Sequence, residues 1–300
     1  MTLRKDGPEE LVPLDVRSPG PTEEYVASDG GPLRLHWRAI ARVRRLRTPR
    51  WWEEVLFIGI SYALYSTVRN AVPGHSVAAF HRAASILRLE TDLHLDAERP
   101  LNKLVASAHW LAYVSSYWYA LMHFIMTIGV LIWLYVRHPL RYRPIRTVLY
   151  TTNILALGGF WFFALAPPRL LPGFVDTVDK YPTVWGSWDT AGVAKLSNQL
   201  AAMPSLHIGW STWCGLVIFT LARHRTTRIL GVAYPLITLF VILGTANHFL
   251  LDAVGGLIVL GLSFGIERLL FGRGAFDSPD QVRRAAPWRR GPTLSSPEQP

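Results

Sequence analysis

The chain has 300 residues, of which 50% are hydrophobic and 17% are charged, and its formal net charge at pH 7 is +10. Soluble domains carry about 25% charged residues, so this composition favours a membrane protein over a soluble enzyme. The positive charge does not indicate a nucleic-acid partner, because the basic residues cluster beside apolar segments, where they set membrane topology and contact anionic lipids. The single cysteine excludes a disulfide framework and a thiolate metal cluster.

The first fifty residues are mostly polar and divide into two parts, and we expect no cleavable signal peptide among them. Residues 1–33 are rich in proline, glycine and acidic residues, and they are predicted to form a disordered cytoplasmic tail. Residues 34–50 contain seven arginines and no acidic residue, and their apolar residues recur every three positions. This pattern is typical of a basic helix that lies on the inner membrane surface.

Six later segments are apolar and close to the ~20 residues needed to cross the hydrocarbon core of a membrane. They are 51–68, 110–136, 147–166, 203–222, 229–245 and 249–266. We predict an all-α protein whose six membrane-spanning helices form one bundle within 51–270, followed by a second disordered cytoplasmic tail at 271–300. Between the first two segments, residues 75–89 are predicted to form a short amphipathic helix. The polar segment 91–103 is expected to rest at the surface. Its polar residues His94, Asp96, Glu98, Arg99 and Asn102 are predicted to form a solvated face, with the lining of a headgroup pocket as the alternative.

The distribution of arginine predicts how the bundle is oriented. The connections 137–146 and 223–228 carry four and three arginines without an acidic residue, whereas the charges of the connection 167–202 are balanced. Basic connections face the cytoplasm according to the positive-inside rule. The sequence therefore predicts a multi-pass protein of the cell membrane with both termini in the cytoplasm.

Polar side chains inside apolar segments are costly and usually functional. Here they are His207, His248 and Asp252, with Arg169 just beyond the third segment. Counted along a helix from the nearest cytoplasmic arginine, His207, His248 and Arg169 lie roughly 24, 30 and 35 Å away, at the outer side of the membrane. We therefore expect them to meet in one extracytoplasmic site. His123 stands alone in its segment and is expected to be a hydrogen-bonded packing residue.

The spacing of these residues suits phosphoryl transfer. The His248 ring can donate an N–H to Asp252, which fixes its tautomer and leaves the other ring nitrogen free to attack. Ser205 and the free backbone N–H groups at the start of the fourth segment can bind phosphate oxygens, as can the guanidinium of Arg169. His207 can give a proton to the leaving oxygen.

The motif Pro-Ser-Leu-His at 204–207, followed 41 residues later by His248-x-x-x-Asp252, resembles the type-2 phosphatidic acid phosphatase superfamily over about 147–266. Within it the chain is most similar to the fungal inositol phosphorylceramide synthases and their bacterial relatives. The resemblance implies a phosphohistidine on His248, orientation of that histidine by Asp252, and proton donation by His207. It implies no metal and no other cofactor, a lipid phosphate or phosphodiester substrate, and an acceptor alcohol such as inositol.

Four motif positions depart from the phosphatases of that superfamily. Leu206 replaces a glycine, valine and isoleucine occupy 241–242 in place of Ser-Arg, and Leu93 stands where a lysine is expected. Arg169 is the first candidate to replace the missing phosphate-binding cations, and Lys195 is the second. These departures favour a phosphotransferase over a plain phosphatase.

Two functions of other classes remain open. One is a proton-coupled transporter or lipid flippase that uses Asp252 as its proton site. The other is a metal-dependent membrane hydrolase with His207, His248 and Asp252 as zinc ligands. The sequence does not distinguish hydrolysis from transfer, nor sphingolipid-like, prenyl phosphate and glycerophospholipid substrates. Anionic membrane lipids are expected partners, and nucleic acid is not.

Overall fold

The computed structural model describes residues 49–71, 76–180, 200–272 and 274–277. The predicted tail 1–33, nearly all of the basic segment 34–50, and Lys195 lie outside the described residues. The helices are α2 (Trp51–Ala71), α3 (Ser76–Asp92), α4 (Glu98–Ser107), α5 (His109–Tyr117), the π-helix η1 (Trp118–Met122), α6 (His123–Arg137), α7 (Pro139–Phe162), the 3-10 helix η2 (Pro168–Leu170), α8 (Thr177–Lys180), α9 (Leu206–Leu221), α10 (Arg225–Gly244) and α11 (Leu250–Phe271). The described chain contains no strand, only an isolated bridge between Leu165 and Ala201.

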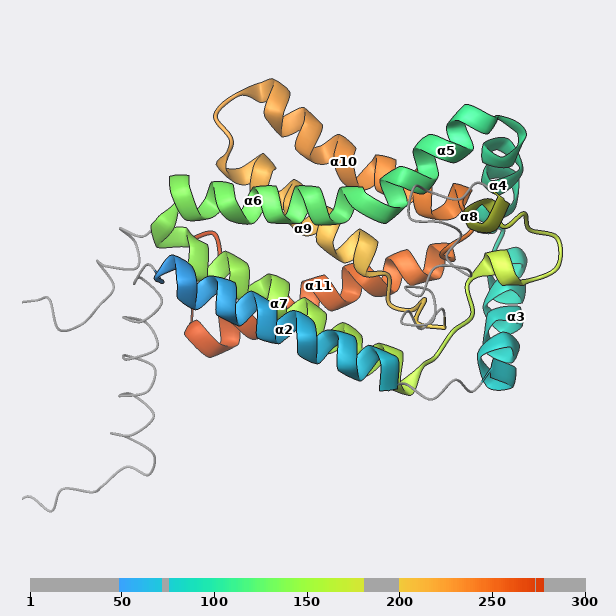
Figure 1. The fold of residues 1–300 in the computed structure, drawn as a ribbon, viewed down its shortest axis with the longest axis horizontal. Coiled ribbons are helices and arrows are strands. Elements are labelled where there is room, and N and C mark those ends of the chain that lie inside the picture. Colours follow the sequence, from blue (N-terminus) through green and yellow to red (C-terminus); the bar gives the residue numbers. More distant parts are fainter. Residues whose placement is uncertain (1–48, 72–75, 181–199, 273, 278–300) are drawn as a thin grey trace, which may run out of the picture.

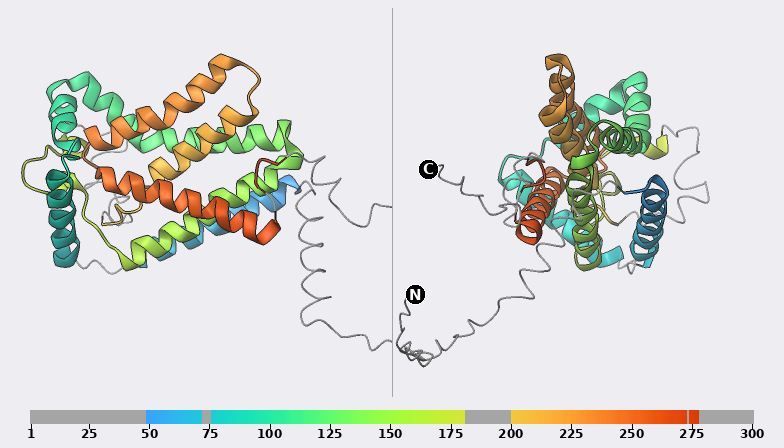
Figure 2. Two further views of the ribbon diagram at one scale, coloured as in Figure 1. Left: turned by 180° about the vertical axis from the view of Figure 1, so that it is seen from behind. Right: turned by 90° about the vertical axis from the view of Figure 1, so that its left-hand side faces the viewer.

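The long helices run side by side in one bundle, with α9 at its centre (Figures 1 and 2). Helix α9 contacts α6, α7, α10 and α11. Its residue Trp213 is completely buried and donates its indole N–H to the carbonyl of Ile145 in α7 at 3.1 Å. Because α9 is surrounded by neighbours, the residues at its ends are held in place from several sides.

Three helical stretches are long and apolar enough to cross a membrane: His109–Arg137, Arg225–Gly244 and Leu250–Phe271. Helix α9 is a shorter apolar helix of 16 residues. The prediction of an all-α membrane protein is therefore confirmed. The number of six crossings stays a prediction.

Two of the predicted connections are wrong in extent, because all of their arginines except Arg223 belong to helices. Between α6 and α7 only His138 is non-helical, and α7 begins at Pro139 instead of residue 147. Helix α10 begins at Arg225, four residues earlier than predicted. A hydropathy pattern ends where charge begins, but arginine is a good helix former and proline suits the first helical turn.

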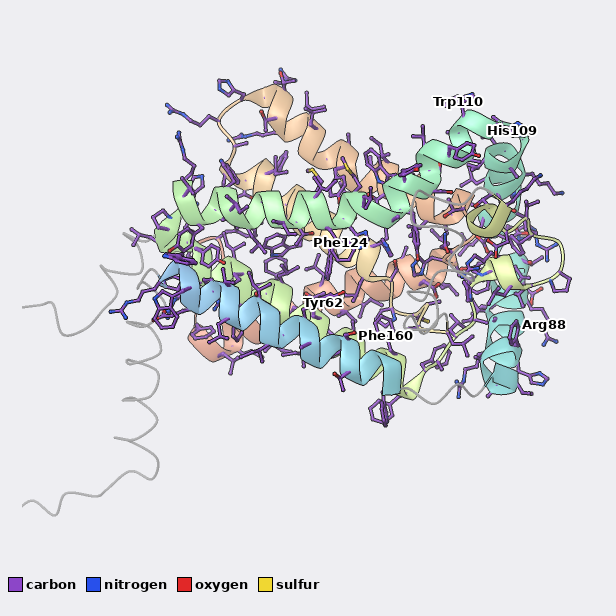
Figure 3. The ribbon with its side chains drawn as sticks, viewed as in Figure 1. Tyr62, Arg88, His109, Trp110, Phe124 and Phe160 are labelled. Carbon is purple, nitrogen blue, oxygen red and sulfur yellow. The ribbon has the colours of Figure 1, made fainter. Side chains whose placement is uncertain are left out.

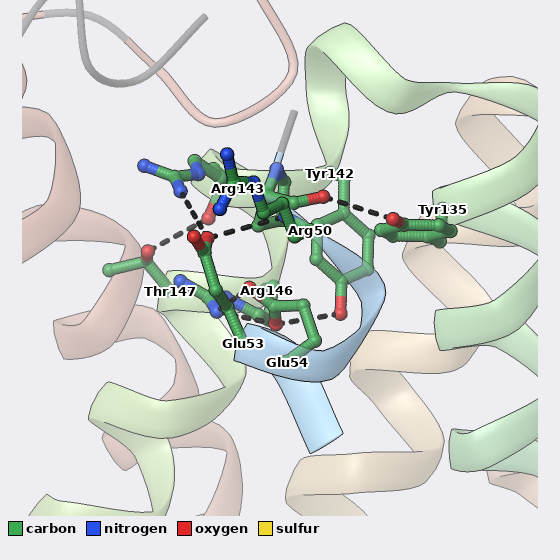
Figure 4. Close-up of polar contacts among 9 residues, drawn as sticks. Arg50, Glu53, Glu54, Tyr135, Tyr142, Arg143, Arg146 and Thr147 are labelled. Carbon is green, nitrogen blue, oxygen red and sulfur yellow. Dashed lines mark hydrogen bonds and ion pairs between the residues drawn. The ribbon is translucent and has the colours of Figure 1, made fainter. Parts of the chain in front are cut away.

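A buried carboxylate attaches α2 to α7 at this basic end of the bundle (Figure 4). Glu54 is 6% exposed, contacts the Arg146 guanidinium at 2.6 Å, and accepts the Tyr142 hydroxyl at 3.0 Å. The Arg146 guanidinium also lies over the ring of Tyr150. A buried charge of this kind requires a partner, so the pair fixes where the first apolar helix sits.

The short helices α3, α4 and α8 gather at the opposite end, where Figure 3 labels Arg88, His109 and Trp110. The prediction that the segment 91–103 is solvated is wrong for Glu98 and Asn102. Glu98 is fully buried and Asn102 is 1% exposed. Helix α4 turns Asn102 inward, where its amide donates to the carbonyl of Gly244 at the end of α10, a backbone group that has no partner within the helix.

Candidate active site

The first turns of α9 and α11 lie against each other and bring the two predicted motifs together. The backbone N–H of Ser205 donates to the carbonyl of Asp252 at 2.9 Å. The helices approach closely because Gly256 has no side chain: a Cβ at this position would lie 2.4 Å from the carbonyl oxygen of Ser205. A glycine is thus required where the two motifs meet.

This close approach makes a testable prediction about Gly256. Alanine at this position collides with the backbone of α9, so Gly256→Ala is expected to lower the free energy of unfolding by about 1–3 kcal/mol. Gly261→Ala is the matched control in the same helix, because a Cβ at Gly261 meets nothing within 4 Å. Thermal unfolding in detergent compares the two, and equal melting temperatures would contradict the close approach.

His248 and Asp252 form the predicted pair, although only Asp252 lies in a helix. His248 lies before α11, whose N-cap is Phe249. The Oδ2 atom of Asp252 lies 3.2 Å from Nδ1 of His248 and accepts the backbone N–H of Phe249 at 2.9 Å. Asp252 therefore both completes the capping box of α11 and is the partner of His248.

The turn before His248 returns the chain from α10 to α11. Ala246 has a positive φ of 52°, an uncommon conformation for a residue with a side chain, which often marks a functional site. The backbone N–H groups of Asn247 and His248 both point to the carbonyl of Ile242, at 3.0 and 3.3 Å. His248 is thus held by its backbone as well as by its ring.

The second ring nitrogen of His248 is the one that does not face Asp252. Nε2 of His248 is buried and finds no hydrogen-bond partner in the described part of the chain. The same holds for the Ser205 hydroxyl, which lies at the N-cap of α9 but does not cap it. Buried polar atoms without partners are rare and call for an explanation such as a ligand.

The structure brings His207 to His248, with 5.5 Å between the ring centroids. Two further rings surround His207: Tyr119 stacks on it at 4.3 Å and His123 meets it edge-on at 4.5 Å. His207 is thus one of the packing partners of His123, whose contacts agree with the hydrogen-bonded packing residue that the sequence predicts. The depth of His123 indicates that it lies in the same layer as His207, because 14 residues separate His123 from Arg137, which is roughly 21 Å along a helix.

A π-helix places Tyr119 beside His207. The turn Trp118–Met122 is wider than the α-helices α5 and α6 on either side, and such π segments often occur at functional sites. The carbonyl of Tyr119 lies 3.0 Å from Nδ1 of His123. The periodicity of the sequence does not reveal this irregularity.

Arg169 lies beside the turn that carries His248. Its backbone N–H donates to the carbonyl of Ala246 at 2.8 Å, and its Nε donates to Oδ1 of Asn247 at 3.0 Å. Its guanidinium also pairs with Asp176 at 2.6 Å, a contact that the sequence did not suggest. Arg169 thus reaches the site region with part of its donor set already engaged.

Among the described residues, no group of three or more His, Cys, Asp or Glu side chains is arranged to hold a metal ion. The ligand set of the metal-dependent alternative is therefore not assembled there. His207, His248 and Asp252 instead form a compact histidine–carboxylate arrangement that suits nucleophilic and acid–base work.

A family model described as the PAP2 superfamily matches residues 84–266, more than half of the chain. The match begins in α3, so it extends further toward the N-terminus than the resemblance over 147–266. It includes His207, His248 and Asp252. Comparisons with curated proteins and with solved structures give no match. The chain belongs to the PAP2 superfamily.

Proposed function

We propose that the protein transfers a phosphoryl group or a phospho-headgroup from a membrane lipid through a phosphohistidine on His248. Membership of the PAP2 superfamily supports phosphatase or phosphotransferase chemistry on phosphate esters. The observation that carries the mechanism is Nε2 of His248, which is buried without a partner in the described chain while Nδ1 faces Asp252. This is the arrangement of an oriented nucleophile.

In the first step, Nε2 of His248 attacks phosphorus and the bond from phosphorus to the leaving oxygen breaks. His207 gives its proton to that oxygen, and Asp252 stabilises the positive charge that forms on the His248 ring. In the second step, water or an alcohol attacks phosphorus while His207 takes its proton. The bond between phosphorus and His248 then breaks and regenerates the enzyme.

The phosphate oxygens need donors, because stabilising their charge is most of the catalytic task. Ser205 offers a buried hydroxyl, and it lies at the start of α9, where the first N–H groups of a helix have no partner within the helix. Arg169 is a candidate because its side chain lies at the turn that carries His248, where its Nε donates to Asn247. Lys195 remains the second candidate cation and lies outside the described residues.

We place this chemistry at the outer face of the membrane with a lipid as substrate. The basic ends of α7 and α10 lie away from α3 and α4 (Figure 1), which supports an extracytoplasmic site under the positive-inside rule. Exposed apolar residues of the α4–α5 region support access from the lipid phase, among them Leu104 and Trp110 at 53% and 69% exposure.

Transfer to an alcohol such as inositol is the finer part of the proposal. Val241 and Ile242, which occupy the Ser-Arg positions of the phosphatases, are buried at the end of α10. They supply no cation to a phosphate there. This departure supports the branch that resembles the fungal inositol phosphorylceramide synthases.

The test supplies detergent-purified protein with lipid phosphates and phosphodiesters, with and without inositol, in the presence of EDTA. We expect phosphate release or headgroup transfer that is insensitive to EDTA. It should persist in His81→Ala, which replaces an exposed histidine of α3, and disappear in His248→Ala. Activity abolished by EDTA would favour the metal-dependent hydrolase. Uptake driven by a proton gradient, without phosphate release, would favour the transporter.

A further inference from the structure

Two glutamates outside the proposed machinery are buried beside it. Glu90 near the end of α3 and Glu98 at the start of α4 are both 0% exposed. The connection between them is folded back, because the backbone N–H of Leu95 donates to the carbonyl of Glu90 at 2.7 Å. Charged residues are almost never fully buried unless they are paired, so this pair requires an explanation.

Glu90 is bonded directly to the first turn of α11. Its Oε1 accepts the backbone N–H of Leu251 at 2.7 Å. The first N–H groups of a helix have no partner within it, so a side chain must supply one. Asp252 accepts the N–H of Phe249 in the same turn. Glu90 and Asp252 therefore both hold the turn that carries His248.

The two glutamates need a shared proton. Oε2 of Glu90 and both carboxyl oxygens of Glu98 have no donor in the described chain as long as both groups are ionised. The titratable side chains that act on Glu90 are Glu98 from α4 and Asp252 from α11, and both are acidic. Burial, followed by the hydrogen bond to Glu98, raises the pKa of Glu90 to about 9. Glu90 is thus protonated at neutral pH and donates to Glu98.

We propose that Glu90 is a positioning residue, which joins Glu98 in α4 to the Leu251 N–H in α11 through one shared proton and so holds the His248–Asp252 pair in place. The proposal rests on the proposed function for its effect on turnover. Loss of the proton leaves Glu90 negatively charged beside the carboxyl groups of Glu98 and Asp252. The repulsion then loosens the first turn of α11.

The pH dependence of the melting temperature tests the shared proton without any measurement of activity. The pKa of Glu90 is higher in the folded protein than in the unfolded chain, so its contribution is complete below about pH 4.5 and is lost as pH rises to about 9. Glu90→Gln keeps an acceptor for Leu251 and a donor for Glu98 at every pH. We expect the wild-type melting temperature to fall between pH 6 and 10 more steeply than that of Glu90→Gln. Equal slopes would overturn the proposal.

Turnover tests the positioning role. We expect kcat/KM of the wild type to fall about tenfold per pH unit above the pKa of Glu90, and Glu90→Gln to keep its activity further into alkaline pH. Glu90→Ala should lower kcat by up to about 100-fold through misplacement of His248, with a smaller effect on KM. Glu267→Gln, which replaces another fully buried carboxyl of α11, is the control and should leave the alkaline limb unchanged.

The melting temperatures and the turnover measurements distinguish failure of the proposed function from failure of the positioning role. A wild type without turnover on any lipid would defeat the proposed function, and the slopes of the melting temperatures would still decide the role of Glu90. An active wild type whose alkaline limb is unchanged in Glu90→Gln would defeat the positioning role alone.

Discussion

Replacement of His248 by alanine is expected to lower kcat by at least about 10⁴-fold and to abolish covalent labelling of the protein. The side chain that forms the bond to phosphorus is then missing, and no described residue takes its place beside Asp252. The measurement is rapid quenching with a ³²P-labelled lipid phosphate, followed by a test for an acid-labile, alkali-stable label on the protein. His81→Ala should label as the wild type does.

His207→Ala should behave differently, because His207 is proposed to move protons and not to bind phosphorus. With a lipid substrate, whose alkoxide is a poor leaving group, we expect kcat to fall by about 10²–10⁴-fold. With p-nitrophenyl phosphate, whose leaving group needs no proton, the loss in the labelling step should be much smaller. The same loss with both substrates would contradict a proton-donor role. Substantial labelling in His248→Ala would contradict the nucleophile.

The meeting of His207 with His248 could be predicted from the sequence, because helical rise converts sequence position into depth. The same arithmetic places His123 at a similar depth, but depth alone does not say that its ring meets His207. That contact depends on α6, α9 and the π-helix Trp118–Met122. A constant helical period applied to the sequence does not predict a π-helix.

The burial of Glu98 and Asn102 illustrates a second limit of the sequence. Hydropathy assigns polar residues to water, yet Asn102 donates to the carbonyls of Val175 and Gly244, both at 3.0 Å. The side-chain oxygen Oδ1 of Asn102 accepts the backbone N–H of Val175 at 2.8 Å. Asn102 is buried because it pairs with backbone groups of a helix end and a loop that would otherwise lack partners. Only the tertiary structure shows which ends need them.

Arg169 shows the same limit for charge. Its position just beyond a span predicts that it reaches the outer end of the bundle, and the structure places it at the turn before His248. Its pairing with Asp176, seven residues later, arises from a loop without helical periodicity. The sequence therefore indicates where this cation lies, and the fold decides how much of it is left for phosphate.

Asp252→Asn is expected to lower kcat by about 10²–10⁴-fold while leaving the fold intact. An asparagine can place its amide oxygen where Oδ2 lies, so the N–H of Phe249 keeps its acceptor. The amide is neutral, however, and no longer stabilises the positive charge that forms on the His248 ring when Nε2 attacks phosphorus. Turnover is then lost although every side chain keeps its place.

Asp252→Ala separates the two roles of this carboxylate. It removes the cap as well as the partner of His248, and loss of an N-cap costs about 1 kcal/mol. We therefore expect both variants to lose turnover but only Asp252→Ala to melt at a clearly lower temperature in detergent. An active Asp252→Asn would mean that Asp252 serves as a helix cap alone. Since one oxygen, Oδ2, contacts both His248 and Phe249, the geometry that stabilises α11 is also the geometry that orients the histidine.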